Sequence, residues 1–166
     1  CGLQWPRVKQ ELDKVEKIFL QRTRNEALKV RIVATIDNQS MYCTEGILVL
    51  IPIKANGISM RSLLAILNSK LINYLFATKF LNLAIKAEYL KQLRLPHLSG
   101  KIQNKLENLV DNVMSAKQSD PSTDTTALED EIDFMVYKLY GLTYDELLVV
   151  DPETPITREQ YEAKKL

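Results

Sequence analysis

The sequence has few of the residues on which most catalytic and metal sites depend. Its 166 residues include two cysteines, Cys1 and Cys43, and one histidine, His97. Two cysteines exclude a disulfide-rich scaffold and a four-cysteine zinc site, and one histidine excludes any metal site that requires two imidazoles. A serine or cysteine nucleophile would have only His97 as its base, and we expect this residue to lie in an ordinary loop. The sequence therefore predicts no catalytic residue and no metal ligand in this chain.

Glycine and long apolar runs are scarce as well. The five glycines are dispersed, so the glycine-rich loop of a nucleotide site is missing and we expect no bound cofactor. No apolar run approaches the roughly 18 residues of a membrane-spanning helix, and no signal peptide is recognisable. These features predict a cytoplasmic, monomeric chain that does not contact a membrane. We interpret the start at Cys1, without a methionine, as the beginning of a fragment cut from a longer chain.

The chain has little net charge, +1 in total, but this small sum hides two parts of opposite charge. Residues 1–110 hold 17 Lys or Arg against 8 Asp or Glu, a net charge of +9. Residues 111–166 hold 5 against 13, a net charge of −8. A basic body joined to an acidic tail indicates a polyanionic partner for the body.

The apolar pattern changes period along the chain. Residues 16–58 are β-rich, and the continuous apolar run at 47–51 predicts a strand over 42–53 that is buried on both faces. Helical spacing predicts one amphipathic helix over 60–79, with Ser59 as its N-cap. The remaining predictions for this part are a strand, turn and strand over 82–96 and a helix over 101–117 that Ser99 caps. Together they predict an α+β fold, in which a small antiparallel or mixed sheet is followed by amphipathic helices.

The second part begins with a polar linker at 118–126. A pair of helices is expected over 127–152, with capping boxes at Thr126–Glu129 and Thr143–Glu146 and with Gly141 as a C-cap. Residues 153–166 are predicted to form a charged tail with one loose helix from Thr157.

Exposed cations and amides of the basic body are the candidates for DNA contact. Lys and Arg neutralise phosphates and release counterions, whereas Asn and Gln pair with adenine edges. An ordinary solvated basic face is the alternative interpretation. The candidates for the DNA backbone are Arg22, Arg24, Lys29, Arg31, Lys86, Lys91 and Arg94. The candidates for base contact are Asn25, Asn38 and Gln39.

Two motifs resemble known families. Residues 128–143, LEDEIDFMVYKLYGLT, resemble the closing pattern of adenine-specific DNA methyltransferases from restriction–modification systems. Residues 63–71, LLAILNSKL, and 89–96, YLKQLRLP, resemble the TaqI-like carboxy-terminal specificity domain. With weaker similarities before residue 42, the resemblance covers most of residues 16–148.

The resemblance implies a target-recognition domain over residues 1–117 that binds double-stranded DNA. The parent enzyme would be an adenine-specific methyltransferase that uses S-adenosylmethionine, with or without a fused type II restriction endonuclease. The Asn-Pro-Pro-Tyr type of catalytic motif does not occur in this sequence. Base flipping and methyl transfer are therefore expected in the methyltransferase domain of the parent chain. The alternative is a protein-interaction module, whose helices dock a partner methyltransferase or nuclease subunit as in a specificity subunit.

Overall fold

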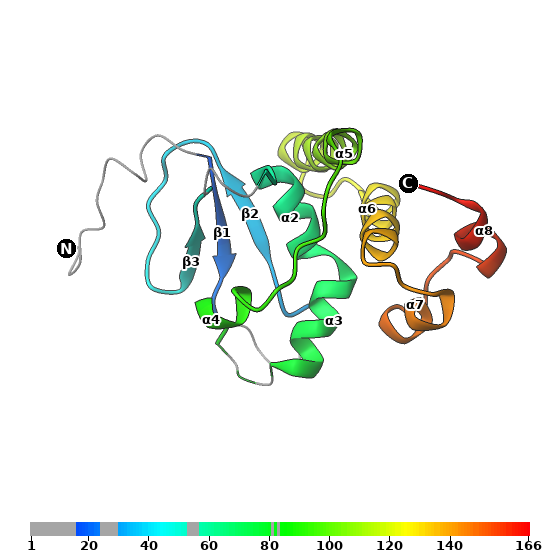
Figure 1. Cartoon of the computed structure of the whole chain (residues 1–166). Helices are drawn as coiled ribbons and strands as arrows, with labels where there is room; N and C mark the ends of the chain where they lie inside the picture. Colours follow the sequence, from blue (N-terminus) through cyan, green and yellow to red (C-terminus); the bar gives the residue numbers. More distant parts are fainter. Residues whose placement is uncertain (1–15, 24–29, 53–56, 81, 83) are drawn as a thin grey trace.

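The computed structural model describes residues 16–23, 30–52, 57–80, 82 and 84–166. Three short strands form an antiparallel sheet in the order β2-β1-β3, and helices follow along the chain (Figure 1). The strands are β1 (Lys17–Gln21), β2 (Ala34–Asp37) and β3 (Ile47–Leu50). The helices are α2 (Met60–Asn68), α3 (Lys70–Lys79), α4 (Ala87–Leu90), α5 (Gly100–Ser119), α6 (Thr126–Leu139), α7 (Tyr144–Val150) and α8 (Arg158–Ala163). This arrangement confirms the predicted α+β class and its antiparallel sheet.

Alternation along the central strand places one face of the sheet against the helices. Ile18 pairs with Ile36 and Leu50 across the two neighbouring strands. Ile18 and Leu20 are fully buried, and helix α2 lies over this face and contacts β1 and β2. Helices α5 and α6 pack behind α2, so α6, α7 and α8 extend away from the sheet (Figure 1).

The third strand is shorter than predicted and lies at an edge. It covers Ile47–Leu50, and all four of its residues are half-buried. Residues 42–46 precede it in a non-strand conformation, Ile51 is exposed, and Ile53 lies outside the described residues. The prediction of burial on both faces was wrong because helix α2 covers only one face of the sheet.

The predicted helix over 60–79 is interrupted at Ser69. This residue has an extended backbone, ends α2 and caps α3, and its hydroxyl donates to the Ile66 carbonyl at 2.7 Å. The apolar spacing continues through the break, which explains why periodicity alone predicted one helix. The predicted caps Ser59 and Ser99 are confirmed, since each hydroxyl accepts an N–H of its own first turn. Helix α5 confirms the prediction over 101–117 and extends it slightly at both ends.

The segment 82–96 contains less strand than predicted. Ala84 forms an isolated bridge with Thr23, and Leu83 lies outside the described residues. The predicted helical turn is present as α4, but residues 93–95 are coil rather than strand. Three residues without a neighbouring strand cannot satisfy their backbone groups as a ladder.

One of the two predicted capping boxes is wrong. Thr125, not Thr126, occupies the N-cap position of α6, without a side-chain capping bond, and the Thr126 hydroxyl instead donates to the Asp124 carboxylate at 2.6 Å. The capping box of Thr143 with Glu146 is confirmed at α7. Gly141 follows α6 with a φ of +70°, the left-handed conformation that favours glycine after a helix.

The carboxy-terminal residues pack more firmly than a loose charged tail. Thr157 and Gln160 form a capping box that starts α8. Tyr161 is 2% exposed, meets the Phe134 ring edge-on at 5.7 Å, and donates its hydroxyl to the Leu142 carbonyl at 2.8 Å. No helix in the described part of the chain is long and apolar enough to cross a membrane.

Candidate nucleic-acid interface

One end of the sheet brings together basic residues from distant parts of the sequence. Arg22 directly follows β1, where its N–H donates to the Gly46 carbonyl at 2.9 Å and its carbonyl accepts the Ile85 N–H at 2.7 Å. These two bonds attach the segment before α4 to the end of β1, so that Arg22 and Lys86 lie at the same end of the sheet. Helix α4 lies beside this end of β1 (Figure 1). We call this region, with the residues listed next, the basic end.

The cations of the basic end are exposed. Lys79 ends α3, Lys86 and Lys91 flank α4, and Arg94 lies in the coil that leaves α4. None of their side chains forms an ion pair with a carboxylate among the described residues. Glu88 is the one acidic residue within α4 and is also exposed. The basic end therefore consists of Arg22, Lys79, Lys86, Lys91 and Arg94.

Several cations elsewhere in the described residues are paired with carboxylates, whereas Lys101, Lys117, Lys138 and Lys165 form no ion pair there. Carboxylates pair with the basic side chains of the sheet core and of the helical layer. The pairs are Lys17–Asp37, Arg61–Glu16, Arg61–Asp111, Lys70–Asp130, Lys70–Asp151, Lys105–Glu131, Lys164–Glu131 and Arg158–Asp145. The acidic helices α6 to α8 also lie on the far side of α2 and α3 from α4 (Figure 1). Folding thus brings five exposed cations without a carboxylate partner among the described residues to one end of the molecule.

Arg31 does not share the exposure of the other candidates. It is half-buried, and its Nη2 atom donates to the Asn82 carbonyl at 2.7 Å and to the Phe80 carbonyl at 3.3 Å. Its backbone N–H donates to the Asn73 side chain at 2.8 Å. The guanidinium therefore joins the segment before β2 to the turn after α3.

Two candidates for base contact lie at the opposite end of the sheet. Asn38 and Gln39 are exposed just after β2, next to the position where Asp37 pairs with Lys17. Arg22 follows the other end of β1. At about 3.3 Å per residue along a strand, roughly 13 Å separates the two ends of β1.

Asp37 fixes the start of the loop that carries these amides. Its carboxylate accepts the Gln39 N–H at 2.8 Å, the Met41 N–H at 2.9 Å and the Lys17 ammonium at 2.6 Å. Although burial opposes its charge, the Lys17 ammonium and these two N–H donors lower the pKa of Asp37. The loop then returns to the basic end at Gly46.

The other three candidates, Arg24, Lys29 and Asn25, lie outside the described residues. His97 is an exposed coil residue, as predicted. Among the described residues, no three His, Cys, Asp or Glu side chains are grouped so that they could hold a metal ion.

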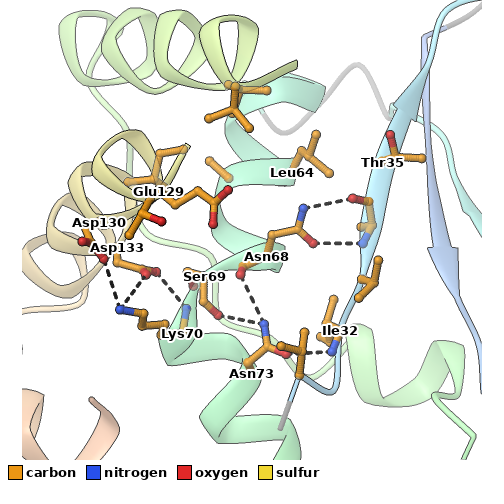
Figure 2. Close-up of a pocket in the computed structure, with 18 of the residues that line it drawn as sticks. Ile32, Thr35, Leu64, Asn68, Ser69, Lys70, Asn73, Glu129, Asp130 and Asp133 are labelled. Atoms are coloured by element: carbon orange, nitrogen blue, oxygen red, sulfur yellow. Dashed lines mark hydrogen bonds and ion pairs between the residues drawn. The ribbon is translucent and has the colours of Figure 1, made fainter. Parts of the chain in front are cut away.

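A second feature, which the sequence did not predict, is a groove of about 820 Å³ between β2 and helices α2, α3, α5 and α6. Its lining is mainly apolar, and Val30, Val33 and Tyr74 are exposed at its rim. Figure 2 shows Asn68 and Glu129 directed into the space between β2 and α6. The exposed apolar rim is typical of a surface that contacts another molecule.

The groove has a sealed strand edge on one side. β2 is an edge strand, and the Asn68 side chain pairs with both the N–H and the carbonyl of Ala34, at 2.9 and 3.0 Å. Asn73 accepts the N–H groups of Arg31 and Ile32, each at 2.8 Å (Figure 2). These amides occupy the positions that an added strand would need.

On the other side of the groove, Lys70 joins the two halves of the chain. Its N–H donates to Asp133 at 2.8 Å, and its ammonium lies 3.2 Å from Asp130 and 2.9 Å from Asp151 (Figure 2). Burial raises the pKa of Asp133 to about 7. The LLAILNSKL motif contains Asn68, Ser69 and Lys70, and the LEDEIDFMVYKLYGLT motif contains Asp130 and Asp133. The two motifs therefore meet at this side of the groove.

Comparison with known families identifies the chain. Residues 4–96 match the family described as TaqI-like C-terminal specificity domain. The chain belongs to this family. The matched range contains the whole sheet, α2 to α4 and the basic end, whereas α5 to α8 lie beyond it. No curated protein and no solved structure matches the chain.

Membership establishes the general role of the chain. It is a DNA-recognition domain of the kind found in restriction–modification enzymes, and domains of this family are not catalytic themselves. The match does not identify the residues that contact DNA, which must be inferred from exposure and ion pairing in the structure.

Proposed function

We propose that this chain recognises DNA for an adenine-specific methyltransferase of a restriction–modification system and holds the sugar–phosphate backbone at its basic end. The observation that carries the proposal is the basic end, whose exposed cations have no carboxylate partner among the described residues and lie within the range that matches the specificity family. Such cations bind phosphates because they displace the counterions condensed on DNA. Contacts of this kind fix the register of a protein on the duplex without reading its sequence.

Base reading is assigned to the loop that follows β2. Asn38 and Gln39 are exposed amides, which can pair bidentately with adenine. Because they lie at the other end of the sheet from Arg22, one duplex can reach both groups only if it runs along the strands. The loop spans this distance, since it starts at Asp37 and ends at Gly46 beside Arg22.

Methyl transfer is assigned to another part of the parent enzyme. The LEDEIDFMVYKLYGLT motif supports an adenine-specific methyltransferase, and S-adenosylmethionine would bind to the catalytic domain rather than to this chain. Restriction–modification of cellular DNA places the enzyme in the cytoplasm. The partners of this chain are then double-stranded DNA and that catalytic domain, and we expect the chain to act as a monomer.

The groove supports a second candidate function. Val30, Val33 and Tyr74 expose apolar surface beside a sealed strand edge, which suits a protein partner better than DNA. In this case the chain would act as a specificity module that docks a methyltransferase or nuclease subunit. The salt dependence of DNA binding distinguishes the two candidates.

The test measures the binding of a labelled mixed-sequence duplex by fluorescence anisotropy between 50 and 200 mM salt. Each phosphate contact contributes about 0.9 to the slope of log affinity against log salt, so five contacts predict a loss of roughly 500-fold over this range. Lys91→Ala and Arg94→Ala should each weaken binding and lower the slope by about 0.9.

Lys105→Ala is the matched control, because Lys105 is an exposed lysine that pairs with Glu131 outside the basic end. It should leave both the affinity and the slope unchanged. An affinity that hardly changes with salt, or an equal effect of all three substitutions, would contradict the proposed DNA contact and favour the docking module.

A further inference from the structure

The turn between α3 and α4 contains a stacked aromatic pair. The rings of Phe80 and Tyr89 have centroids 4.4 Å apart and planes inclined by 15°. The Asn82 side chain donates to the Tyr89 hydroxyl at 2.6 Å. These contacts join the end of α3 directly to α4, so Lys79 and Lys86 lie beside the same pair of stacked rings.

Each ring of the pair holds one lysine. The Lys79 ammonium lies 5.3 Å from the centre of the Phe80 ring, and the Lys86 ammonium lies 5.9 Å from the centre of the Tyr89 ring. Cation–π contacts at these distances restrict the rotamers of long side chains. A lysine that is already restricted loses less conformational entropy when it binds a phosphate.

Arg31 fixes this turn to the sheet. Its guanidinium donates to the carbonyls of Phe80 and Asn82, while its own backbone is held by Asn73. The half-buried guanidinium is therefore directed at protein carbonyls.

We propose that Arg31 is a positioning residue, and that it holds Lys79 and Lys86 as a pre-ordered pair that binds phosphate groups of the DNA backbone. This inference rests on the proposed DNA-binding function. It changes the role of Arg31 from a phosphate contact to a support for two other contacts. It also gives Lys79, at the end of α3, an ordered position from which to bind the backbone.

The test is a cycle of variants of the full chain, with the binding of a labelled mixed-sequence duplex measured by anisotropy. Arg31→Lys keeps the charge but cannot span the two carbonyls with a planar fork. It should weaken binding about fivefold, or roughly 1 kcal/mol, and should lower the salt slope although the net charge is unchanged. In the Lys79→Ala/Lys86→Ala background the same substitution should change the affinity less than about twofold, because the two lysines that Arg31 positions are absent.

An equal loss in both backgrounds would show that Arg31 contacts DNA itself, and no loss in either would show that it has no role; both results overturn the inference.

Tyr89→Phe provides a second cycle without any change of charge, since it removes only the hydroxyl that Asn82 binds. It should weaken binding in the wild-type background and have no effect in the Lys79→Ala/Lys86→Ala background, where both supported lysines are gone. An effect of equal size in both backgrounds, or none in either, would also overturn the inference. Thermal unfolding checks that each variant is folded.

Lys91→Ala separates this inference from the proposed function. If Lys91→Ala and the double lysine variant both leave the affinity unchanged, the proposed DNA contact itself fails. If both weaken binding while the Arg31 cycle is additive, only the positioning role fails.

Discussion

At the scale of single residues, buried charges join segments that lie far apart in the sequence. Asp133 is 6% exposed and accepts the Lys70 N–H at the start of α3, with the Lys70 ammonium 3.8 Å from its other oxygen. Burial raises the pKa of Asp133 to about 7, and the nearby carboxylates of Asp130 and Asp151 act in the same direction. The single ammonium of Lys70 thus serves three carboxylates.

This arrangement makes the free energy of unfolding depend on pH. In the unfolded chain the pKa of Asp133 is close to its ordinary value of about 3.9, so between about pH 4 and pH 7 the folded state binds a proton that the unfolded state has lost. The contribution of Asp133 to stability therefore falls as the pH rises from about 4 to about 7. Asp133→Asn keeps an oxygen that can accept the Lys70 N–H and has no charge to bury.

Between pH 5 and pH 8 we therefore expect the free energy of unfolding of the wild type to fall relative to that of Asp133→Asn. A pKa shift of one unit corresponds to about 1.4 kcal/mol, so the change should be a few kcal/mol. Urea unfolding at several pH values measures it. Glu131→Gln is the control: although burial opposes its charge, Lys105 and Lys164 lower the pKa of Glu131, so its contribution is lost only as the pH falls below about 4.5 and its difference from wild type should hardly vary between pH 5 and pH 8. A difference between Asp133→Asn and wild type that does not vary with pH would contradict this account.

At the scale of elements, the loop after β2 connects the two ends of the sheet. Asp37 holds its first residues through the Gln39 and Met41 N–H groups, and Gly46 attaches its last residues to Arg22. Anchors at both ends restrict the loop, which suits a segment that presents amides to base edges.

We expect Asn38→Ala and Gln39→Ala to change which sequences the chain prefers. Loss of a bidentate contact to one base costs about 1–3 kcal/mol against the correct sequence and little against others. Selection from a pool of randomised duplexes, compared between wild type and variants, measures this preference. An equal loss of affinity on every duplex would reassign both residues to the DNA backbone.

At the scale of the whole molecule, the hydrophobic core extends beyond the range that matches the family. The match ends at residue 96, but α5 contributes Leu106 and Val110 to the core, and α6 contributes Phe134 and Met135. Helix α5 packs on α2, and α6 packs on both α2 and α3. The range that matches the family and the folding unit of this chain therefore have different boundaries.

A chain that ends at residue 99 should accordingly fail to fold cooperatively. It would expose the surfaces of α2 that α5 covers and leave the N–H of Lys70 without its Asp133 acceptor. Circular dichroism during heating should show no sharp transition for this fragment, whereas the full chain should unfold in one. A cooperative transition in the fragment would show that residues 16–96 form an independent domain.

The sequence by itself determined the α+β class, most of the helix caps and the separation of charge. Ser59, Ser99 and Thr143 cap helices because a hydroxyl satisfies an N–H only a few residues away, so the necessary information is local. The motifs likewise pointed to the specificity family before any tertiary contact was known. Periodicity failed at Ser69 because the apolar face of the predicted helix continues across the break.

Only the tertiary structure decided which charges are available to DNA. Arg22 and Arg31 look equivalent in the sequence, yet one is exposed and the other donates to carbonyls more than 45 residues away. Lys70 is neutralised by carboxylates that follow it by 60 to 81 residues, whereas Lys86 and Lys91 have no such partner among the described residues. Asn38 and Arg22 lie at opposite ends of the sheet because antiparallel pairing reverses the direction of β2 relative to β1. Such pairings depend on contacts between distant segments, which local residue patterns do not specify.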